Sequence, residues 1–230
     1  MAEPQVNELI VHGIVVGVFA ENCWVIGNRR TGEAICIDPG DNPEEILAMA
    51  RDMGVRIKVI ANSHGHLDHV MGVRGVQEAT NARFLLHPGD IDIVRGSAAS
   101  AARWMGVQVE PPPDPDGLLA DGDDVDVDGV KLKVIHTPGH TPGSVSFYVN
   151  GLLFSGDTLF QGSIGRTDLP GGDYDLEMAS IVDRLLALPD DTIVLPGHMA
   201  QTTIGQERLR NPYVRMEQER RASAREDGGA

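Results

Sequence analysis

The chain has 230 residues, enough for one domain with a sizeable core, and 41% of them are hydrophobic. Its formal net charge is −15, and because such an acidic surface repels phosphate backbones, we expect no nucleic-acid partner. No apolar run approaches the roughly 18 residues of a membrane span, and no Lys or Arg precedes Arg29, so we expect no membrane segment, no signal peptide and a cytoplasmic location.

The N-terminal part of the chain is predicted to form strands and one helix. Turn signals separate three β-rich runs, at residues 9–19, 23–27 and 34–38. The following helix is expected to have Asn42 as its capping residue and Pro43 in its first turn. Residues 56–62 then read as another strand. Cys23 and Cys36 lie in the strand-like runs and are expected to be free, buried thiols.

The remainder of the chain alternates between strands and helices. We expect a helix over 69–79, a strand over 83–87, short helices within 88–106, a proline-rich loop over 110–117, a hairpin around 128–129, strands at 144–149, 152–157 and 192–198, an amphipathic helix over 175–188, and helix from 206 onward. This order predicts an α+β sandwich of mixed sheets between helices. Residues 1–222 are expected to form a single domain, and residues 223–230 a disordered tail.

Four potential metal ligands fall within the stretch NSHGHLDHV, directly after the strand over 56–62. In extended backbone, residues i and i+2 point the same way, so His64 and His66 can bind one metal together. Asp68 and His69 enter the next helix and can serve a second metal. Imidazole and carboxylate groups in these numbers suit zinc, iron or manganese.

Three further candidates each follow an apolar run and lie beside a glycine: His140, Asp157 and His198. Strand ends at one edge of a sheet can bring such distant side chains together. The predicted division is His64, His66 and His140 on one metal, Asp68, His69 and His198 on the other, and Asp157 bridging both. Seven ligands exceed the four of one tetrahedral ion, and the open positions indicate a catalytic rather than a structural site.

The motifs HGHLDH, TPGHTPGS, GDTLF and LPGH together resemble those of the metallo-β-lactamase superfamily, and the resemblance extends from Asp38 to His198. It implies an αβ/βα sandwich, two mixed β-sheets flanked by helices, with a binuclear site at one edge. Within that superfamily, the stretches GDTLFQGSIGRTDLPGGD and PGHMAQTTIGQERLRNP are similar to those of the short glyoxalase II-like (hydroxyacylglutathione hydrolase-like) enzymes.

This resemblance implies a hydrolase that cleaves acyl thioesters such as S-lactoylglutathione. Two divalent ions, expected to be Zn²⁺ with Fe or Mn as alternatives, would ionise a bound water near neutral pH, and the resulting hydroxide would attack an acyl carbon. Asp68 is expected to orient that hydroxide as well as bind metal. Arg166 is a candidate for binding a substrate carboxylate through its guanidinium, or for a structural pair with Asp168 or Asp173.

Other enzymes of the superfamily remain open. A persulfide dioxygenase shares the G-R-T-D stretch at 165–168 and uses a single iron, held by the equivalents of His64, His140 and Asp157. A lactonase on the same fold is a further alternative, as is a metal-binding protein without activity. Secreted β-lactamases generally lack the bridging aspartate.

The thiol half of the substrate is not identified by the sequence. The Cys and Lys that glyoxalase II has after the bridging aspartate are missing here, and only 32 residues follow His198. The resemblance therefore supports the type of reaction better than it supports recognition of glutathione. We expect a monomer or a small homo-oligomer.

Overall fold

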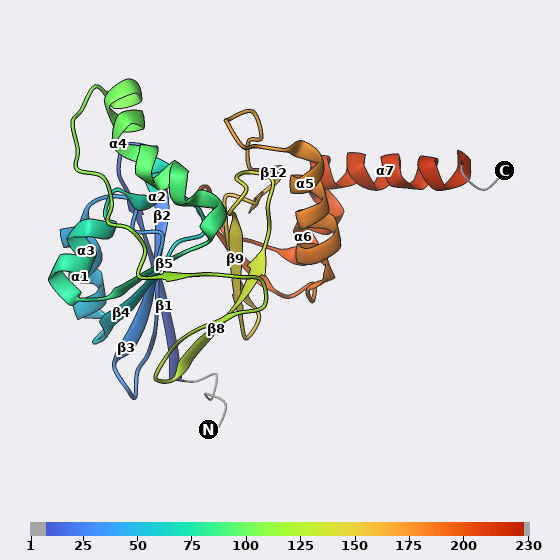
Figure 1. Ribbon diagram of the computed structural model, residues 1–230. Helices are drawn as coiled ribbons and strands as arrows, with labels where there is room; N and C mark the ends of the chain where they lie inside the picture. Colours follow the sequence, from blue (N-terminus) through green and yellow to red (C-terminus); the bar gives the residue numbers. More distant parts are fainter. Residues whose placement is uncertain (1–7, 228–230) are drawn as a thin grey trace.

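The computed structural model describes residues 8–227 and consists of two stacked six-stranded mixed sheets with helices on their outer faces (Figure 1). The first sheet has the order β1-β2-β3-β4-β5-β6, and the second has the order β14-β13-β10-β9-β8-β7. The strands of the first sheet are β1 (Leu9–Val16), β2 (Glu21–Asn28), β3 (Glu33–Ile37), β4 (Arg56–Ala61), β5 (Arg83–Leu86) and β6 (Gly117–Leu118). Those of the second are β7 (Asp124–Val127), β8 (Val130–His136), β9 (Val145–Val149), β10 (Leu152–Gly156), β13 (Ile193–Pro196) and β14 (Thr202–Thr203).

Helices cover both outer faces, and a small two-stranded sheet lies near the second (Figure 1). The first sheet is covered by α1 (Pro43–Asp52), α2 (Leu67–Val70), α3 (Val73–Thr80), η2 (Pro88–Asp90) and α4 (Ile91–Met105). The second is covered by α5 (Tyr174–Ala179), the π-helix η3 (Ser180–Arg184), the 3₁₀-helix η4 (Leu185–Ala187), α6 (Ile204–Arg210) and α7 (Pro212–Asp227). The small sheet pairs β11 (Leu159–Phe160) with β12 (Ser163–Ile164).

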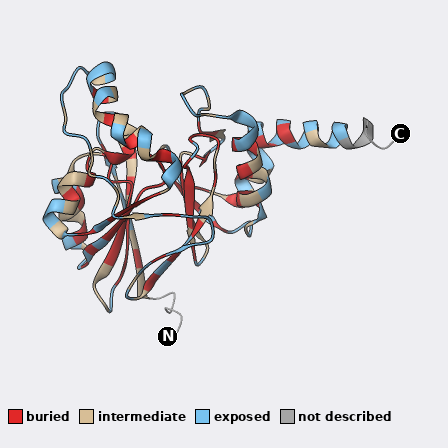
Figure 2. Cartoon of the chain, in the orientation of Figure 1, coloured by how far each residue is buried: buried red, intermediate tan, exposed pale blue. Residues whose placement is uncertain are grey.

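Side-chain alternation along the strands produces three apolar layers. In β2, Val25 packs toward the helices of the first sheet, whereas the neighbouring Ile26 packs into the layer between the two sheets. Phe147 and Phe154 fill that central layer from the second sheet. A third layer joins the second sheet to its own helices. Both sheets are therefore buried on both faces, as the colouring by burial shows (Figure 2), which is the αβ/βα arrangement expected from the sequence.

Several sequence expectations are confirmed. The two expected hairpins form, since β7 pairs with β8 and β9 with β10, both antiparallel. Cys23 and Cys36 are buried and free. No helix within residues 8–227 combines the length and the apolar character that crossing a membrane requires.

Other expectations differ from the structure in detail. The helix expected over 69–79 is two helices, because the backbone N–H of Gly72 donates to the carbonyl of Pro39 and the chain turns there. The stretch 88–106, expected as short helices, is mainly the single helix α4. The helix expected over 175–188 is an α-helix that continues as a π-helix and then as a 3₁₀-helix. Asn42 occupies the cap position of α1, but its side-chain oxygen accepts from the backbone N–H of Gly17 instead of capping the helix.

At the C-terminus, α7 projects away from the two sheets (Figure 1). The helix continues through residue 227, five residues into the tail expected over 223–230. Residues 228–230 of that tail lie outside the described residues.

The topology brings the ends of several strands together at one edge of the sandwich. β4 ends in the first sheet, and β10 and β13 run parallel and end side by side in the second. Two backbone hydrogen bonds join the sheets at this edge, from Val145 N to Ser63 O (2.8 Å) and from Asn22 N to Gly197 O (2.6 Å). The loops that follow these strands, together with the loop between β8 and β9, carry the candidate ligands.

Candidate metal centre

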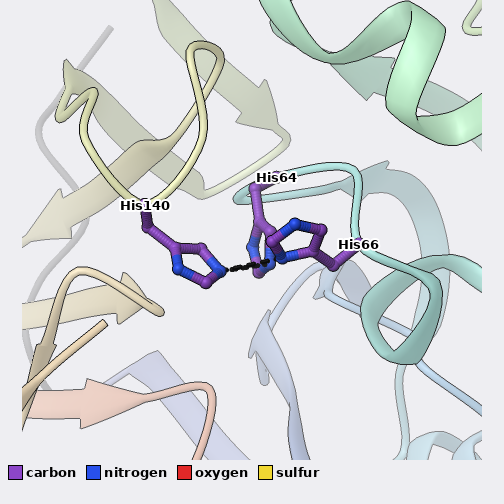
Figure 3. Close-up of side chains that lie close together, drawn as sticks. All are labelled: His64, His66 and His140. Atoms are coloured by element: carbon purple, nitrogen blue, oxygen red, sulfur yellow. Dashed lines mark hydrogen bonds between the residues drawn. The ribbon is translucent and has the colours of Figure 1, made fainter. Parts of the chain in front are cut away.

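Three imidazoles converge from two loops, the loop after β4 and the loop between β8 and β9 (Figure 3). His66 Nδ1 lies 2.8 Å and His64 Nε2 lies 3.3 Å from His140 Nε2. Two ligands of one tetrahedral zinc ion with usual Zn–N bond lengths lie about 3.3 Å apart. The three nitrogens therefore have the spacing of a shared metal site.

A second set lies beside the first and combines one carboxylate with two imidazoles. Asp68 Oδ2 is 3.2 Å from His198 Nε2 and 3.9 Å from His69 Nε2. Asp68 and His69 belong to α2, whereas His198 follows β13. The second set can also hold a metal ion, because its ligand atoms lie within 4.8 Å of one another.

Asp157 lies between the two sets, directly after β10. Its Oδ2 is 3.7 Å from His140 Nε2 of the first set and 3.6 Å from His198 Nε2 of the second. Its Oδ1 is 3.4 Å from His69 Nε2, yet neither of these two buried atoms has a hydrogen-bond partner. Since buried polar atoms are almost always partnered, a carboxylate oxygen and an imidazole nitrogen left facing one centre fit a metal ion.

Asp38 fixes the orientation of one histidine in each set. The Nδ1–H of His69 donates to Asp38 Oδ2 (3.1 Å), as does the hydroxyl of Ser63 (2.6 Å). With its proton directed at Asp38, Ser63 Oγ is left to accept from His64 Nδ1, 3.0 Å away. Both histidines therefore carry the proton on Nδ1 and turn Nε2 toward the centre, the outer-shell arrangement that metal-ligating histidines use.

His140 is held at two points. Its Nδ1–H donates to the backbone carbonyl of Arg166 (2.8 Å), which leaves Nε2 free for a metal. Its backbone N–H donates to Glu177 Oε2 (2.8 Å). The side chain of Arg166 forms two hydrogen bonds with Asp168 and is 60% exposed. Of the two alternatives for Arg166, binding a substrate carboxylate or pairing with a neighbouring aspartate, the structure shows the pair with Asp168.

The electrostatics of the centre follow from burial and from crowding. Burial and the neighbouring imidazoles lower the pKa of His66 to about 4 and hold that of His64 well below its usual value. Burial opposes a charge on His69 too, but the carboxylates of Asp157 and Asp68 raise its pKa well above the usual value. His64 and His66 are thus neutral imidazoles, which are the form that binds metal.

An apolar hollow opens beside Asp68. The turn between β1 and β2, Met71 and Met105 line it. Val18 and Phe19, in that turn, are exposed. These two exposed side chains would give an uncharged group of a substrate apolar contacts at this side of the centre.

The structure brings together all seven predicted ligands. Sequence reasoning missed the buried carboxyl groups that surround them, namely Glu21, Asp38, Asp90 and Glu177. Asp38 does carry a signal, because it ends the apolar run of β3 in the way that Asp157 ends that of β10. Glu21 lies with Oε1 3.9 Å from His69 Nδ1, and burial raises its pKa well above the usual value.

Comparison with known families identifies the class of protein. The family model of the metallo-β-lactamase superfamily matches residues 16–198, so the chain belongs to that superfamily. Membership, together with the His and Asp clusters, makes it a metallohydrolase.

Individual relatives are similar over nearly their whole length. A Haemophilus influenzae protein named hydroxyacylglutathione hydrolase GloC is 35% identical over 209 residues, which cover 87% of this chain and 96% of that protein. The crystal structure of BLEG-1, named a B3 metallo-β-lactamase, has a TM-score of 0.83 and 36% identity, covering 89% of this chain and 99% of that one. TTHA1623, solved in a di-iron-bound form, has a TM-score of 0.79 and 38% identity, covering 88% of this chain and 99% of that one.

Proposed function

We propose that the protein is a binuclear metal-dependent hydrolase that cleaves acyl thioesters, with S-lactoylglutathione as the first substrate to test. The observation that carries the proposal is the position of Asp157 between two ligand sets, with Oδ1 buried and unpartnered. The 35% identity to the protein named hydroxyacylglutathione hydrolase supports the choice of substrate. Zn²⁺ is the ion we expect, and iron is supported by the di-iron-bound relative.

The ligands divide as the geometry groups them. His64, His66 and His140 would hold one ion, Asp68, His69 and His198 the other, and Asp157 both. When bound, such a pair of ions activates a water and polarises a substrate carbonyl. The protein supplies the orientation: Asp38 keeps the Nε2 atoms of His64 and His69 directed at the centre.

Two further groups of the chain would act on the substrate side. Asp68 is 21% exposed, so its carboxylate can accept a hydrogen bond from the attacking water. The exposed apolar side chains of Val18 and Phe19, in the turn between β1 and β2, would contact the uncharged part of the acyl group.

The first experiment is to measure metal identity and stoichiometry by mass spectrometry on protein purified without a histidine tag, followed by a panel of acyl thioesters. We expect close to two ions per chain and hydrolysis of at least one thioester. His66→Ala should lose one ion and nearly all turnover while remaining folded by circular dichroism. Near-normal turnover in that variant would rule out the assignment.

Three other activities would be recognised by extending the same experiment to other substrates. One iron per chain, together with oxygen uptake on glutathione persulfide, would favour a persulfide dioxygenase, which shares the 165–168 stretch. Hydrolysis of a chromogenic β-lactam but of no thioester would favour β-lactamase activity, which the similarity to BLEG-1 supports. Opening of a lactone panel would favour a lactonase.

A further inference from the structure

One buried carboxylate outside the seven ligands contacts both loops that carry the first set. Asp90 ends η2 and precedes α4, and it is 0% exposed. Among the described residues, no lysine or arginine side chain lies within ion-pair distance of it. Its two oxygens are instead satisfied by hydrogen bonds from the ligand loops. A buried carboxylate whose partners all lie in these loops calls for an explanation.

The first contact is with the loop after β4. Asp90 Oδ2 accepts from the backbone N–H of Gly65 at 2.8 Å. Gly65 lies between His64 and His66, so this bond fixes the peptide that separates the two imidazoles.

The second contact is with the loop between β8 and β9. Asp90 Oδ2 accepts from the hydroxyl of Thr141 at 2.7 Å, and Oδ1 accepts from the backbone N–H of Gly143 at 2.7 Å. Thr141 directly follows His140. Ser144 Oγ lies 2.7 Å from Thr141 Oγ1 and accepts from the backbone N–H of Thr141, which holds that hydroxyl in place.

Steric contacts give independent evidence for the same role. A Cβ at Gly65 would lie 2.9 Å from the backbone oxygen of Asp90, and a Cβ at Gly143 would lie 2.5 Å from Asp90 Oδ1. Neither glycine has a positive φ. Glycine is therefore required in both loops by the close approach of Asp90, rather than by a left-handed backbone.

We propose that Asp90 is a positioning residue that sets the separation between the loop of His64 and His66 and the loop of His140. One carboxylate bonded to both loops holds them at the distance at which the three imidazole nitrogens meet. The role rests on the proposed function of the centre as a metal site. In this role Asp90 takes no part in the reaction itself and would contact neither the metal nor the substrate.

The test is the metal affinity of variants, measured by titrating metal-free protein with Zn²⁺ against a chromophoric chelator. In Asp90→Asn, an amide oxygen in the place of Oδ2 keeps the bonds from Gly65 and Thr141 but turns the amide nitrogen toward the N–H of Gly143. An amide oxygen in the place of Oδ1 keeps only the bond from Gly143, so either orientation leaves a buried N–H of a ligand loop without an acceptor. We expect one of the two ions to bind at least about tenfold more weakly, the usual cost of losing an outer-shell partner. Turnover should fall through kcat, with KM for the thioester little changed.

Two variants of Thr141 provide a matched test with a smaller expected effect than Asp90→Asn. Thr141→Val removes the hydroxyl donor at constant shape and should weaken the same ion severalfold, whereas Thr141→Ser keeps the donor and should restore wild-type affinity. Asp116→Asn is the control, because Asp116 Oδ2 also accepts from a backbone N–H, that of Phe84 (2.8 Å), but contacts neither ligand loop. It should bind both ions as the wild type does.

Wild-type affinity for both ions in Asp90→Asn and in Thr141→Val would overturn the proposal. If Asp90→Asn does not fold, the comparison of Thr141→Val with Thr141→Ser decides the matter alone. A wild-type protein that binds two ions but hydrolyses no thioester would refute the proposed function while leaving this test intact, because the readout is affinity. A wild-type protein that binds no metal would overturn both.

Discussion

The two halves of the metal centre are built from different groups and face different surroundings. The first set, His64, His66 and His140, consists of imidazoles only and is held by bonds to the loop backbone. The second set includes a carboxylate, and two of its members, Asp68 and His198, are each 21% exposed. Only His69 of the second set is fully buried.

This difference indicates that the two ligand sets have different roles. A more enclosed set, in which His64 and His140 are buried and other residues hold the loops in place, suits an ion whose position must not change. A partly exposed set with a carboxylate suits the side where water and substrate arrive. Asp157 joins the two, so we expect it to be the residue whose loss affects both halves.

Asp157→Asn is the largest effect that we expect. The amide keeps the shape but loses the charge that both ions would share, and its nitrogen cannot coordinate metal. Metal content should fall for both sets, and activity should fall by more than the roughly 10- to 100-fold cost of an outer-shell change. Mass spectrometry of metal content and thioester turnover measure this. Retention of two ions with normal activity would show that Asp157 does not bridge.

One histidine from each set can be removed to test the asymmetry between the halves. His140→Ala and His198→Ala should each lose one ion and most of the activity. His140 is 3% exposed, so its alanine variant leaves a buried gap and should destabilise the metal-free protein by about 1–3 kcal/mol. His198 is 21% exposed, so His198→Ala leaves a smaller buried gap and should destabilise the metal-free protein by less.

Urea unfolding of both metal-free variants gives the comparison. Equal destabilisation by the two alanines would contradict the distinction between an enclosed and an open half.

The convergence of the seven candidate ligands could be predicted from the sequence, whereas the groups that hold them could not. Histidine and aspartate at the end of an apolar run are visible in the chain itself, because strand ends are local features. Asp90 shows no such pattern, since its partners lie 25 to 53 residues away in sequence. Only the folded chain reveals that Gly65 and Gly143 pack against it.

The helices illustrate the same limit. The hydrophobic pattern over 69–79 predicts one helix, but the bond from Gly72 to Pro39 interrupts it. Asn42 carries a capping signal, and the β1–β2 turn uses its side chain instead. Local propensity predicted the type of the longer elements, and tertiary contacts decided where they end.

Asp38→Asn has an intermediate expected effect and tests whether one carboxylate serves both halves. Asp38 Oδ2 accepts from both Ser63 Oγ and His69 Nδ1, and Oδ1 accepts from the backbone N–H of Ser63. An amide that places its oxygen at Oδ2 turns its nitrogen toward that N–H and also lacks the negative charge, so both histidine orientations are weakened. Metal affinity should fall about 10- to 100-fold. Ser63→Ala is the matched variant, because it breaks the link to His64 but keeps the link to His69. Chelator competition should therefore show one ion weakened by Ser63→Ala and both weakened by Asp38→Asn.

The smallest effect concerns Glu177, which supports the first half without being a ligand. Burial raises its pKa from 4.5 to about 9 in the metal-free protein. Between these values the folded protein keeps the proton that the unfolded chain releases, so folding takes up a proton and stability falls as pH rises. Below pH 4.5 both states are protonated, and the dependence disappears.

Glu177→Gln removes this dependence and keeps an oxygen for the backbone N–H of His140. Relative to the wild type, the metal-free variant should gain up to about 1.4 kcal/mol of stability for each pH unit between roughly pH 5 and pH 9. Urea unfolding at several pH values measures the difference. Glu217→Gln is the control, because the arginine partners of Glu217 lower its pKa, and this variant should not show the same gain. A pH-independent difference between Glu177→Gln and the wild type would mean that Glu177 is ionised in the fold. The enclosed half would then contain a negative charge beside His140, and its distinction from the open half would rest on exposure alone.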